Sequence, residues 1–396
     1  KMHGTKVTGA NVSVRVSDRF MQAVANGDTE YELRFPVKGK PVYTRNIDPQ
    51  LLWKKIIHNA WKSAEPGVLF WDTIIRESLP DCYSHVGFES VSVNPCGEII
   101  LCPDDSCRLT AINLYSYVKD PFTKKAEFDF GLFDEHVRLA MRFMDDIIDL
   151  ELEKIDRIIS KIKADPELAE TKFVELNLWK RIRKKCQEGR RTGLGITAEG
   201  DMLAALGLTY GTKKATNFAE SVHQAFCISA YRESCEMAKE RGKFEHFDAA
   251  LEATNPFMQR IAEADPELHK DLRKHGRRNI AMLTIAPTGS VSICSNTTSG
   301  IEPAFMISYR RRRKVNPNDK GVKVSFVDQV GDSWEEYQVF HPHFETWLVA
   351  NGYNVEEVKR MSDQEMASII EKSPYHKATS NDVDWVEKVA MQGRIQ

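Results

Sequence analysis

Short apolar segments of strand character alternate with long amphipathic helical segments, and this alternation constrains the fold more than any single motif. Residues 11–16 carry valine at every second position, which is typical of a strand. Residues 132–152 place apolar side chains on one stripe at helical spacing. Residues 280–286 form a continuous apolar run that predicts a buried strand. Strands that alternate with helices predict an α/β architecture.

Capping residues and periodicity predict the remaining elements. A helix is predicted to begin at Asp48, because an N-cap carboxylate precedes a proline at the first helical position. Residues 215–241 predict another long helix, residues 154–184 a charged and exposed helix, and Gly193–Ile196 a tight strand or turn. No repeat, low-complexity segment or linker interrupts the pattern. The whole chain, residues 1–396, is therefore interpreted as one domain.

The composition argues against several classes of partner. Lys and Arg total 55 and Asp and Glu total 57, a net charge of -2, whereas nucleic-acid-binding proteins usually carry a basic excess. No apolar run approaches the roughly 18 residues that span a bilayer, and no signal peptide is recognisable. We therefore expect a cytoplasmic protein without membrane contact. The 8 cysteines include no CxxC pair, which predicts reduced thiols and no structural zinc site.

The segment Asn94–Glu98 places an amide, a thiol and a carboxylate at alternate positions. Pro95 and Gly97 between them favour a tight loop tip, because proline fixes φ and glycine tolerates unusual values. Such a tip would bring the Cys96 thiol into a pocket beside a base and a hydrogen-bond donor. A carboxylate beside a thiol disfavours the thiolate by repulsion, which suits hydrogen-atom transfer better than nucleophilic attack. From the spacing alone, a structural cysteine buried in a turn is the more common alternative.

A second cluster of small polar residues follows the predicted strand at 280–286. Thr288, Gly289 and Ser290 let backbone N–H groups approach an anion, and the hydroxyls add donors. The turn is therefore a candidate phosphate loop. Considered alone, an ordinary turn is the better interpretation, since the same residues are frequent in turns.

These two segments occur with further motifs that together resemble the large catalytic subunits of ribonucleotide reductases. Residues 94–98, with Cys107 and residues 111–114, are similar to the finger-loop signature of that family. The other similar segments are, in chain order, Gly9–Val14, Glu65–Phe70, Arg191–Ile196, Pro287–Ser290 and Ser299–Pro303. The resemblance implies an α/β fold: a ten-stranded α/β barrel of two five-stranded halves around a central finger loop, present here only in part.

The resemblance also implies a radical reaction that reduces ribonucleotides to 2′-deoxyribonucleotides. Cys96 would carry a thiyl radical that abstracts the 3′ hydrogen of the ribose. Glu98 would act as general base toward the 3′ hydroxyl, and Asn94 would hold the ribose hydroxyls by hydrogen bonds. Cys107 is similar to the second redox cysteine of the family, which supplies a reducing equivalent and ends in a disulfide.

The boundaries implied by the resemblance are a finger loop at about residues 90–114 and a phosphate loop at about residues 286–303. Within the second loop, the expected substrate phosphate-binding residues are Pro287, Thr288, Gly289 and Ser290. The chain is expected to be truncated at both ends, lacking an N-terminal half-barrel and a C-terminal part. A second polypeptide would then complete the barrel and carry the disulfide partner of Cys107.

The expected cofactor follows from the residues beside the radical cysteine. Pro95 and Gly97 resemble the adenosylcobalamin-dependent class II enzymes rather than the class paired with a diiron subunit. Adenosylcobalamin would then be the radical source, and an external dithiol such as thioredoxin would reduce the disulfide. Gly4–Lys6 resembles the end of the family's effector loop.

Two functions of other classes stay open. A nucleotide-binding regulatory protein, or a split-enzyme fragment without independent turnover, would keep the barrel and lose the reaction. A glycyl-radical enzyme shares the barrel and the finger cysteine, but Met391–Arg394 is a poor match to its glycyl loop. The basic run Arg310–Lys314 is interpreted as a solvated face, and His341 and His343 as ordinary histidines rather than a metal-ligand pair.

Overall fold

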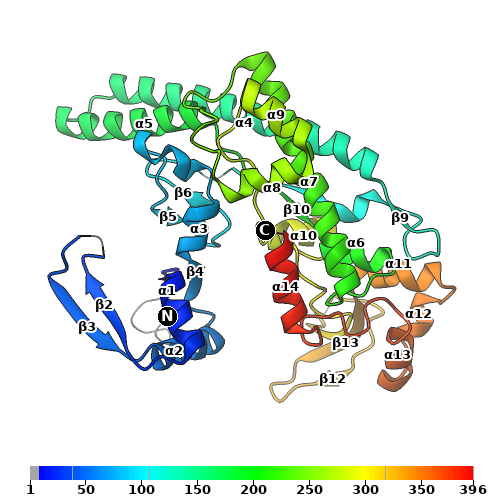
Figure 1. The fold of residues 1–396 in the computed structure, drawn as a ribbon. Coiled ribbons are helices and arrows are strands. Elements are labelled where there is room, and N and C mark those ends of the chain that lie inside the picture. The colour runs from blue at the N-terminus through cyan, green and yellow to red at the C-terminus, as the bar shows by residue number, and fades with distance from the viewer. Residues whose placement is uncertain (1–8, 38, 107, 317, 396) are drawn as a thin grey trace. The chain divides into compact units, whose positions relative to one another are not determined.

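A computed structural model describes the chain from Gly9 to Ile395, apart from residues 38, 107 and 317. Its packing divides the chain into two compact units (Figure 1). The first unit comprises the chain up to Ser106 together with Glu245–Arg273, and the second comprises the remainder. The assignment of the whole chain to one catalytic domain stays a prediction.

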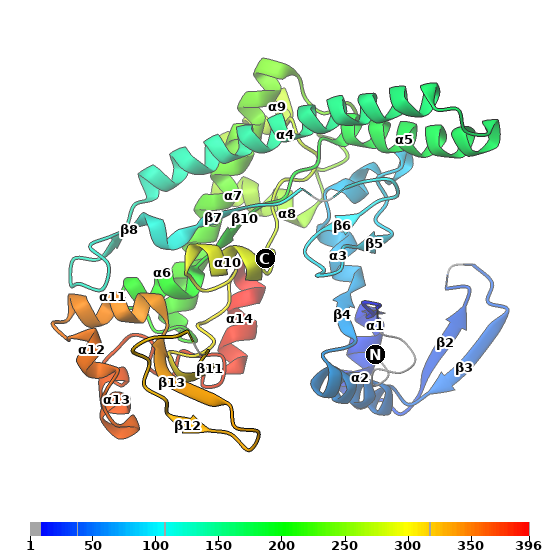
Figure 2. The same ribbon diagram turned by 180° about the vertical axis from the view of Figure 1, so that it is seen from behind.

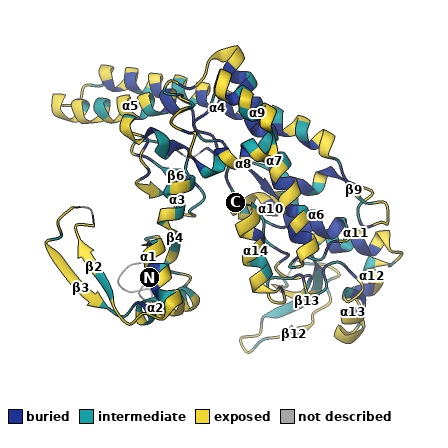
Figure 3. Ribbon diagram, in the orientation of Figure 1, coloured by how far each residue is buried: buried dark blue, intermediate teal, exposed yellow. Residues whose placement is uncertain are grey.

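The first unit is built from short strand pairs and helices. Strands β1 (Ser13–Val16) and β4 (Gly67–Phe70) pair in parallel, whereas β2 (Tyr31–Phe35) and β3 (Tyr43–Ile47) form an antiparallel hairpin that is mostly exposed (Figure 3). A further antiparallel pair, β5 (Ser92–Val93) and β6 (Ile100–Leu101), carries the predicted finger loop. The helices are α1 (Asp18–Asn26), α2 (Pro49–Ser63), α3 (Trp71–Glu77), the 3-10 helix η1 (Pro80–Val86), α8 (Pro256–Ala264) and α9 (Pro266–His275).

The N-terminus of α2 shows how local sequence sets an element boundary. The Asp48 side chain accepts hydrogen bonds from the N–H groups of Gln50 (2.8 Å) and Leu51 (3.1 Å). Pro49 occupies the first helical position, where a missing N–H costs nothing. The predicted start of this helix is confirmed.

The second unit contains the long helices and the parallel strand pair of β7 (Thr110–Asn113) and β10 (Leu194–Thr197). Helices α4 (Phe130–Ala164) and α5 (Ala169–Gly189) lie side by side in both views (Figures 1 and 2). Strands β11 (Ser308–Lys314), β12 (Phe326–Val327) and β13 (Ser333–Phe340) form an antiparallel sheet. The other elements are η2 (Leu114–Tyr117), β8 (Val118–Lys119), β9 (Glu127–Phe128), α6 (Glu199–Ala205), α7 (Lys213–Arg241), α10 (Gly289–Ser295), α11 (Pro342–Ala350), α12 (Val355–Val358), α13 (Asp363–Ile370) and α14 (Trp385–Ile395).

The predicted helix at residues 154–184 is mostly exposed, as expected, but it is wrong in its extent. Helix α4 continues to Ala164, and α5 begins only at Ala169. Pro166 explains the break, because a proline disfavours the helical conformation of the residue before it, and Asp165 adopts an extended ψ of 139°. The end of α4 also buries isoleucines on one side, namely Ile155, Ile159 and Ile162.

A buried cluster of charged residues joins α4 to the end of α5. The Asp145 side chain is not exposed, and it accepts hydrogen bonds from Arg190 Nε (2.7 Å) and Asn279 Nδ2 (3.1 Å). Arg190 is the C-cap residue of α5 and has a φ of +46°. Arg278 Nε lies 3.3 Å from the same carboxylate. The cluster therefore fixes the segment that leads into residues 280–286.

Two features of the fold bear on the expectations from sequence. The strand pairs of the described residues form separate small sheets and do not close into a barrel. Among the helices of Gly9–Ile395 that the structure describes, none has the length and apolar character needed to cross a membrane.

Candidate functional site

A tight hairpin presents the cysteine of the predicted finger loop. Between β5 and β6, the Asn94 backbone N–H donates to the Ile99 carbonyl (3.1 Å), and the Asn94 Oδ1 accepts from the Ile99 N–H (3.0 Å). The Gly97 N–H donates to the Asn94 carbonyl at 3.0 Å. The φ of Gly97 is +84°, in the left-handed region that favours glycine. The predicted loop tip is confirmed.

Cys96 lies at this tip as an exposed free thiol, and the half-buried side chains of Asn94 and Glu98 flank it. Asn94 uses its Oδ1 to close the loop, and within the described residues its Nδ2 donates to no protein group. Its amide is therefore available to a ligand. The exposure of Cys96 disfavours the alternative of a structural cysteine buried in a turn.

The candidate phosphate loop lies in the second unit, at the carboxyl ends of parallel strands. The Leu194 N–H donates to the Met282 carbonyl (2.8 Å), and the Thr284 N–H donates to the Leu194 carbonyl (3.0 Å). The segment 280–286 is thus extended beside β10, although only Leu283 forms a β-bridge. Gly195 permits this approach, since a Cβ at that position would lie 2.6 Å from the Thr284 carbonyl oxygen.

Thr288 organises the turn that follows. Its φ of +49° is left-handed, and its Oγ1 accepts a hydrogen bond from the Gly300 N–H (2.7 Å) and lies 2.9 Å from Thr197 Oγ1. The Thr288 hydroxyl therefore holds the turn together, whereas the sequence suggested it as a donor to phosphate. Gly289 and Ser290 are exposed at the start of α10. Their backbone N–H groups have no partner within the helix.

Asp201, which sequence reasoning missed, lies buried at the start of α6. Its Oδ2 accepts from the Thr298 N–H (2.7 Å), and its own N–H donates to Thr298 Oγ1 (3.1 Å). Its Oδ1 pairs with His341 Nε2 (2.6 Å) and accepts from the Tyr375 hydroxyl (2.8 Å). Burial alone would raise the pKa of Asp201, but the hydrogen bond and charge of His341 hold it below its ordinary value.

His343 lies beside this cluster without a hydrogen-bond partner of its own. Its ring packs on Tyr115 with 3.7 Å between the ring centroids, and both ring nitrogens are buried and unpaired among the described residues. Burial lowers the pKa of His343, and the charge of Asp201 only partly offsets this effect. The two histidines therefore differ: His341 is bound to a carboxylate, and His343 is held neutral.

Acidic residues pair with most of the basic run on β11. Arg312 pairs with Glu336, Arg313 with Glu335 (2.6 Å) and Lys314 with Asp332 (2.6 Å). A further ion pair joins Arg310 to Asp363 at 2.9 Å. The side chains are exposed, so the interpretation of this run as a solvated face is confirmed.

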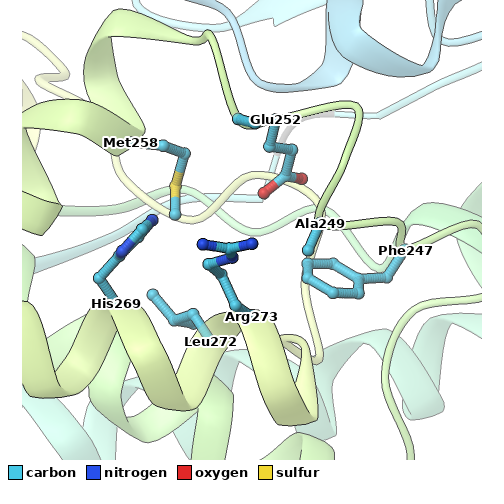
Figure 4. A pocket seen from close by; sticks show the side chains of 8 residues that line it. Phe247, Ala249, Glu252, Met258, His269, Leu272 and Arg273 are labelled. Carbon is cyan, nitrogen blue, oxygen red and sulfur yellow. The ribbon is translucent and has the colours of Figure 1, made fainter.

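A small cavity in the first unit contains none of the predicted site residues. Its volume is about 70 Å³, and it is lined by Phe247, Ala249, Glu252, Ala253, Met258, His269, Leu272 and Arg273. The side chains of Glu252 and Arg273 reach into it from opposite sides (Figure 4). The buried Glu252 also accepts a hydrogen bond from the Tyr83 hydroxyl.

The structure does not describe every residue that the sequence singled out. Cys107 and the segment Gly4–Lys6 lie outside the described residues. Cys96 and Cys294 are exposed free thiols. Asn94, Cys96 and Glu98 share one hairpin of the first unit, whereas Pro287, Thr288, Gly289 and Ser290 share one turn of the second.

Comparison with curated proteins finds relatives of known chemistry. The chain is 32% identical over 301 residues to a vitamin B12-dependent ribonucleoside-diphosphate reductase of Thermoplasma acidophilum, covering 76% of this chain and 32% of that protein. A protein of the same name from Mycobacterium tuberculosis is 30% identical over 301 residues, covering 76% of this chain and 36% of that protein. The chain thus spans about a third of the length of these relatives.

A solved structure and a family model each match nearly the whole chain. The α subunit of a class Id ribonucleotide reductase from Actinobacillus ureae superposes with a TM-score of 0.60 at 17% identity, covering 97% of this chain and 56% of that one. This likeness shows a shared mixed α/β fold. The family model described as the ribonucleotide reductase barrel domain matches residues 3–396. The chain therefore belongs to the ribonucleotide reductase family, of whose barrel domain it forms a part.

Proposed function

We propose that the chain is the part of a ribonucleotide reductase that carries the radical cysteine, Cys96, and reduces ribonucleotides to 2′-deoxyribonucleotides. The observation that supports this most is the hairpin tip. It exposes one thiol between an amide whose Nδ2 is available and a carboxylate, Glu98. A purely structural cysteine requires neither neighbour.

Each side chain of the tip has a step in this proposal. The Cys96 thiyl radical takes the 3′ hydrogen atom of the ribose and becomes a thiol; it later returns a hydrogen atom to C3′, so the thiyl radical is regenerated. Glu98 takes the proton of the 3′ hydroxyl as the O–H bond weakens. Asn94 donates its Nδ2 hydrogens to a ribose hydroxyl while its Oδ1 keeps the loop closed.

Loss of the 2′ hydroxyl as water requires two electrons and two protons. Cys107 and a second cysteine supply them and are oxidised to a disulfide, which an external dithiol such as thioredoxin reduces by exchange. The second cysteine would come from another part of the protein or from a second polypeptide. Each turnover converts one ribonucleotide into one deoxyribonucleotide and one water. The atoms and electrons balance because one dithiol is oxidised to a disulfide.

The substrate phosphates are proposed to bind at Pro287, Thr288, Gly289 and Ser290. Carboxyl ends of parallel strands are frequent ligand sites in α/β proteins, and here β10 and the segment 280–286 end together. Because the Thr288 hydroxyl is used within the turn, backbone N–H groups and the exposed Ser290 would provide the donors.

Adenosylcobalamin is the proposed cofactor, since the relatives from Thermoplasma acidophilum and Mycobacterium tuberculosis are named as vitamin B12-dependent. When bound, it supplies the oxidising radical equivalent that generates the thiyl radical. An exposed thiol at a hairpin tip fits this requirement, because a buried one could not meet an external radical source. Cys96 is the residue that would face the cofactor.

The test is a reduction assay with CDP and CTP, adenosylcobalamin and a dithiol, with and without a polypeptide that supplies the second redox cysteine. Cys96→Ser should abolish reduction and leave CDP binding unchanged. Cys227→Ser, which removes a half-buried thiol from α7, serves as the control and should retain turnover. Normal turnover by Cys96→Ser would refute the proposal. CDP binding without reduction under every condition would instead support a nucleotide-binding regulatory protein.

A further inference from the structure

We propose that Asp201 is a positioning residue for the nucleotide phosphate site: its buried carboxylate fixes residues 297–300, which in turn hold the Thr288 turn. The inference rests on the function proposed above, because it takes the Thr288 turn as the place where phosphate binds. It gives a role to a residue outside both segments of the candidate site.

Asp201 clamps Thr298 by two reciprocal hydrogen bonds. The Thr298 N–H donates to Asp201 Oδ2 at 2.7 Å, and the Asp201 N–H donates to Thr298 Oγ1 at 3.1 Å. Helix α6 supports the clamp, since all of its residues are buried (Figure 3). Two bonds between the same pair of residues fix orientation as well as distance, so Thr298 has little freedom relative to α6.

The fixed segment then holds Thr288. Two residues after Thr298, the Gly300 N–H donates to Thr288 Oγ1 at 2.7 Å, and the Gly300 carbonyl accepts from the Glu199 N–H at 3.2 Å. Gly300 has a φ of +46°, and a Cβ there would lie 2.9 Å from the Ala286 carbonyl oxygen. Residues 298–300 are therefore packed too closely to move alone, and a shift of Thr298 would displace the Thr288 turn.

The other oxygen of Asp201 is held by side chains from distant parts of the chain. His341 Nε2 lies at 2.6 Å and the Tyr375 hydroxyl at 2.8 Å from Oδ1, and the Asp201 side chain is fully buried. Burying an ionised carboxylate costs free energy unless it is hydrogen-bonded. Here its partners leave Oδ2 directed at a backbone N–H of the 297–300 segment, which is the arrangement that a positioning role requires.

The test compares the affinities for CDP and for cytidine, measured by equilibrium dialysis on the full chain. In Asp201→Ala, the Thr298 N–H loses its acceptor, so CDP should bind at least about tenfold more weakly while cytidine binds as before. Asp201→Asn keeps an oxygen for that N–H and should restore most of the CDP affinity. A merely structural role would lower both affinities together, because cytidine lacks only the phosphates.

A control and a milder variant complete the design. Glu233→Ala removes another buried carboxylate, which is bound to Arg138 at 2.6 Å, and should leave the CDP-to-cytidine ratio unchanged. Should Asp201→Ala fail to fold, Thr298→Val removes only the hydroxyl that accepts from Asp201, and the same selective loss is expected. Equal loss of both ligands, or unchanged CDP affinity, would overturn the positioning role. Absence of CDP binding by the unaltered chain, both alone and with the second polypeptide of the reduction assay, would overturn the proposed function and this inference together.

Discussion

Replacing Asp145 with alanine removes the carboxylate on which several parts of the second unit converge. The side chain of Asp145 is not exposed, and it binds Arg190 (2.7 Å), Asn279 (3.1 Å) and Arg278 (3.3 Å). These partners come from the end of α5 and from the segment that precedes residues 280–286. The substitution therefore leaves buried positive charge without its main partner.

The expected loss of stability follows from the geometry. Removing one partner of a buried ion pair typically costs about 3–5 kcal/mol. Arg190 keeps a second carboxylate, because Asp149 lies 2.8 Å from its Nη1, but Asp149 is 52% exposed and water weakens that pair. We therefore expect a loss of about 3 kcal/mol, which is a large part of the roughly 5–15 kcal/mol that stabilises a folded domain.

Urea unfolding followed by circular dichroism measures this loss as a free energy. The neighbouring Asp146→Ala is the matched control, since Asp146 is 57% exposed and pairs with Arg241 at 2.7 Å. An exposed pair contributes at most about 1 kcal/mol. If Asp145→Ala costs no more than Asp146→Ala, the reasoning about the buried cluster is refuted.

The same cluster predicts a pH dependence with a definite sign. Burial would raise the pKa of Asp145, but hydrogen bonds and charge from Arg190 and Arg278 lower it below the ordinary 3.8. The folded state therefore binds the proton less tightly than the unfolded state does. The contribution of Asp145 is fully present above pH values of about 4, and it is lost as the pH falls through the folded pKa.

Three further substitutions test other parts of the structure. His343→Phe keeps a ring on Tyr115 and removes a group whose pKa is lowered from 6.5 by burial. Below that pH the free energy of unfolding of the parent protein should fall by up to about 1.4 kcal/mol per pH unit, and that of the variant should fall less steeply. An equally steep fall in the variant would contradict this role of His343. Gly195→Ala places a Cβ 2.6 Å from the Thr284 carbonyl oxygen and should cost about 1–3 kcal/mol in urea unfolding, whereas Gly393→Ala, which meets no atom within 4 Å, should cost none. Asn94→Asp keeps the oxygen that closes the hairpin and removes the amide donor, so kcat/KM should fall roughly 10- to 100-fold with unchanged melting temperature.

Local patterns in the sequence predicted the elements whose causes are local. Asp48 caps its helix through the next residues of the chain, and the loop tip around Cys96 follows from Pro95 and Gly97, so both were visible without a structure. The break after Ala164 was also signalled, by Pro166, but the charge of the surrounding residues concealed it.

The Asp201 cluster could not have been predicted in this way. Its partners His341 and Tyr375 are separated from it by 140 and 174 positions. No periodicity or motif links residues so far apart, and the contacts exist only after α6, α11 and the segment near Tyr375 have packed. The use of the Thr288 hydroxyl within the turn escaped prediction for the same reason, since its donor is Gly300 on a separate segment.

The exposed ion pairs between β11 and β13 make the stability of this strand pair depend on ionic strength, whereas the stability of the buried interior does not. Arg312 and Arg313 lie on alternate faces of β11, and each pairs with a glutamate of β13. The ion pairs on both faces are exposed, so mobile ions can screen them. At about 1 M salt the Debye length is only about 3 Å, and such exposed pairs lose most of their attraction. Concentrated salt should therefore loosen the β11–β13 strand pair first, while the buried pair of Asp145 and Arg190 keeps the helices joined.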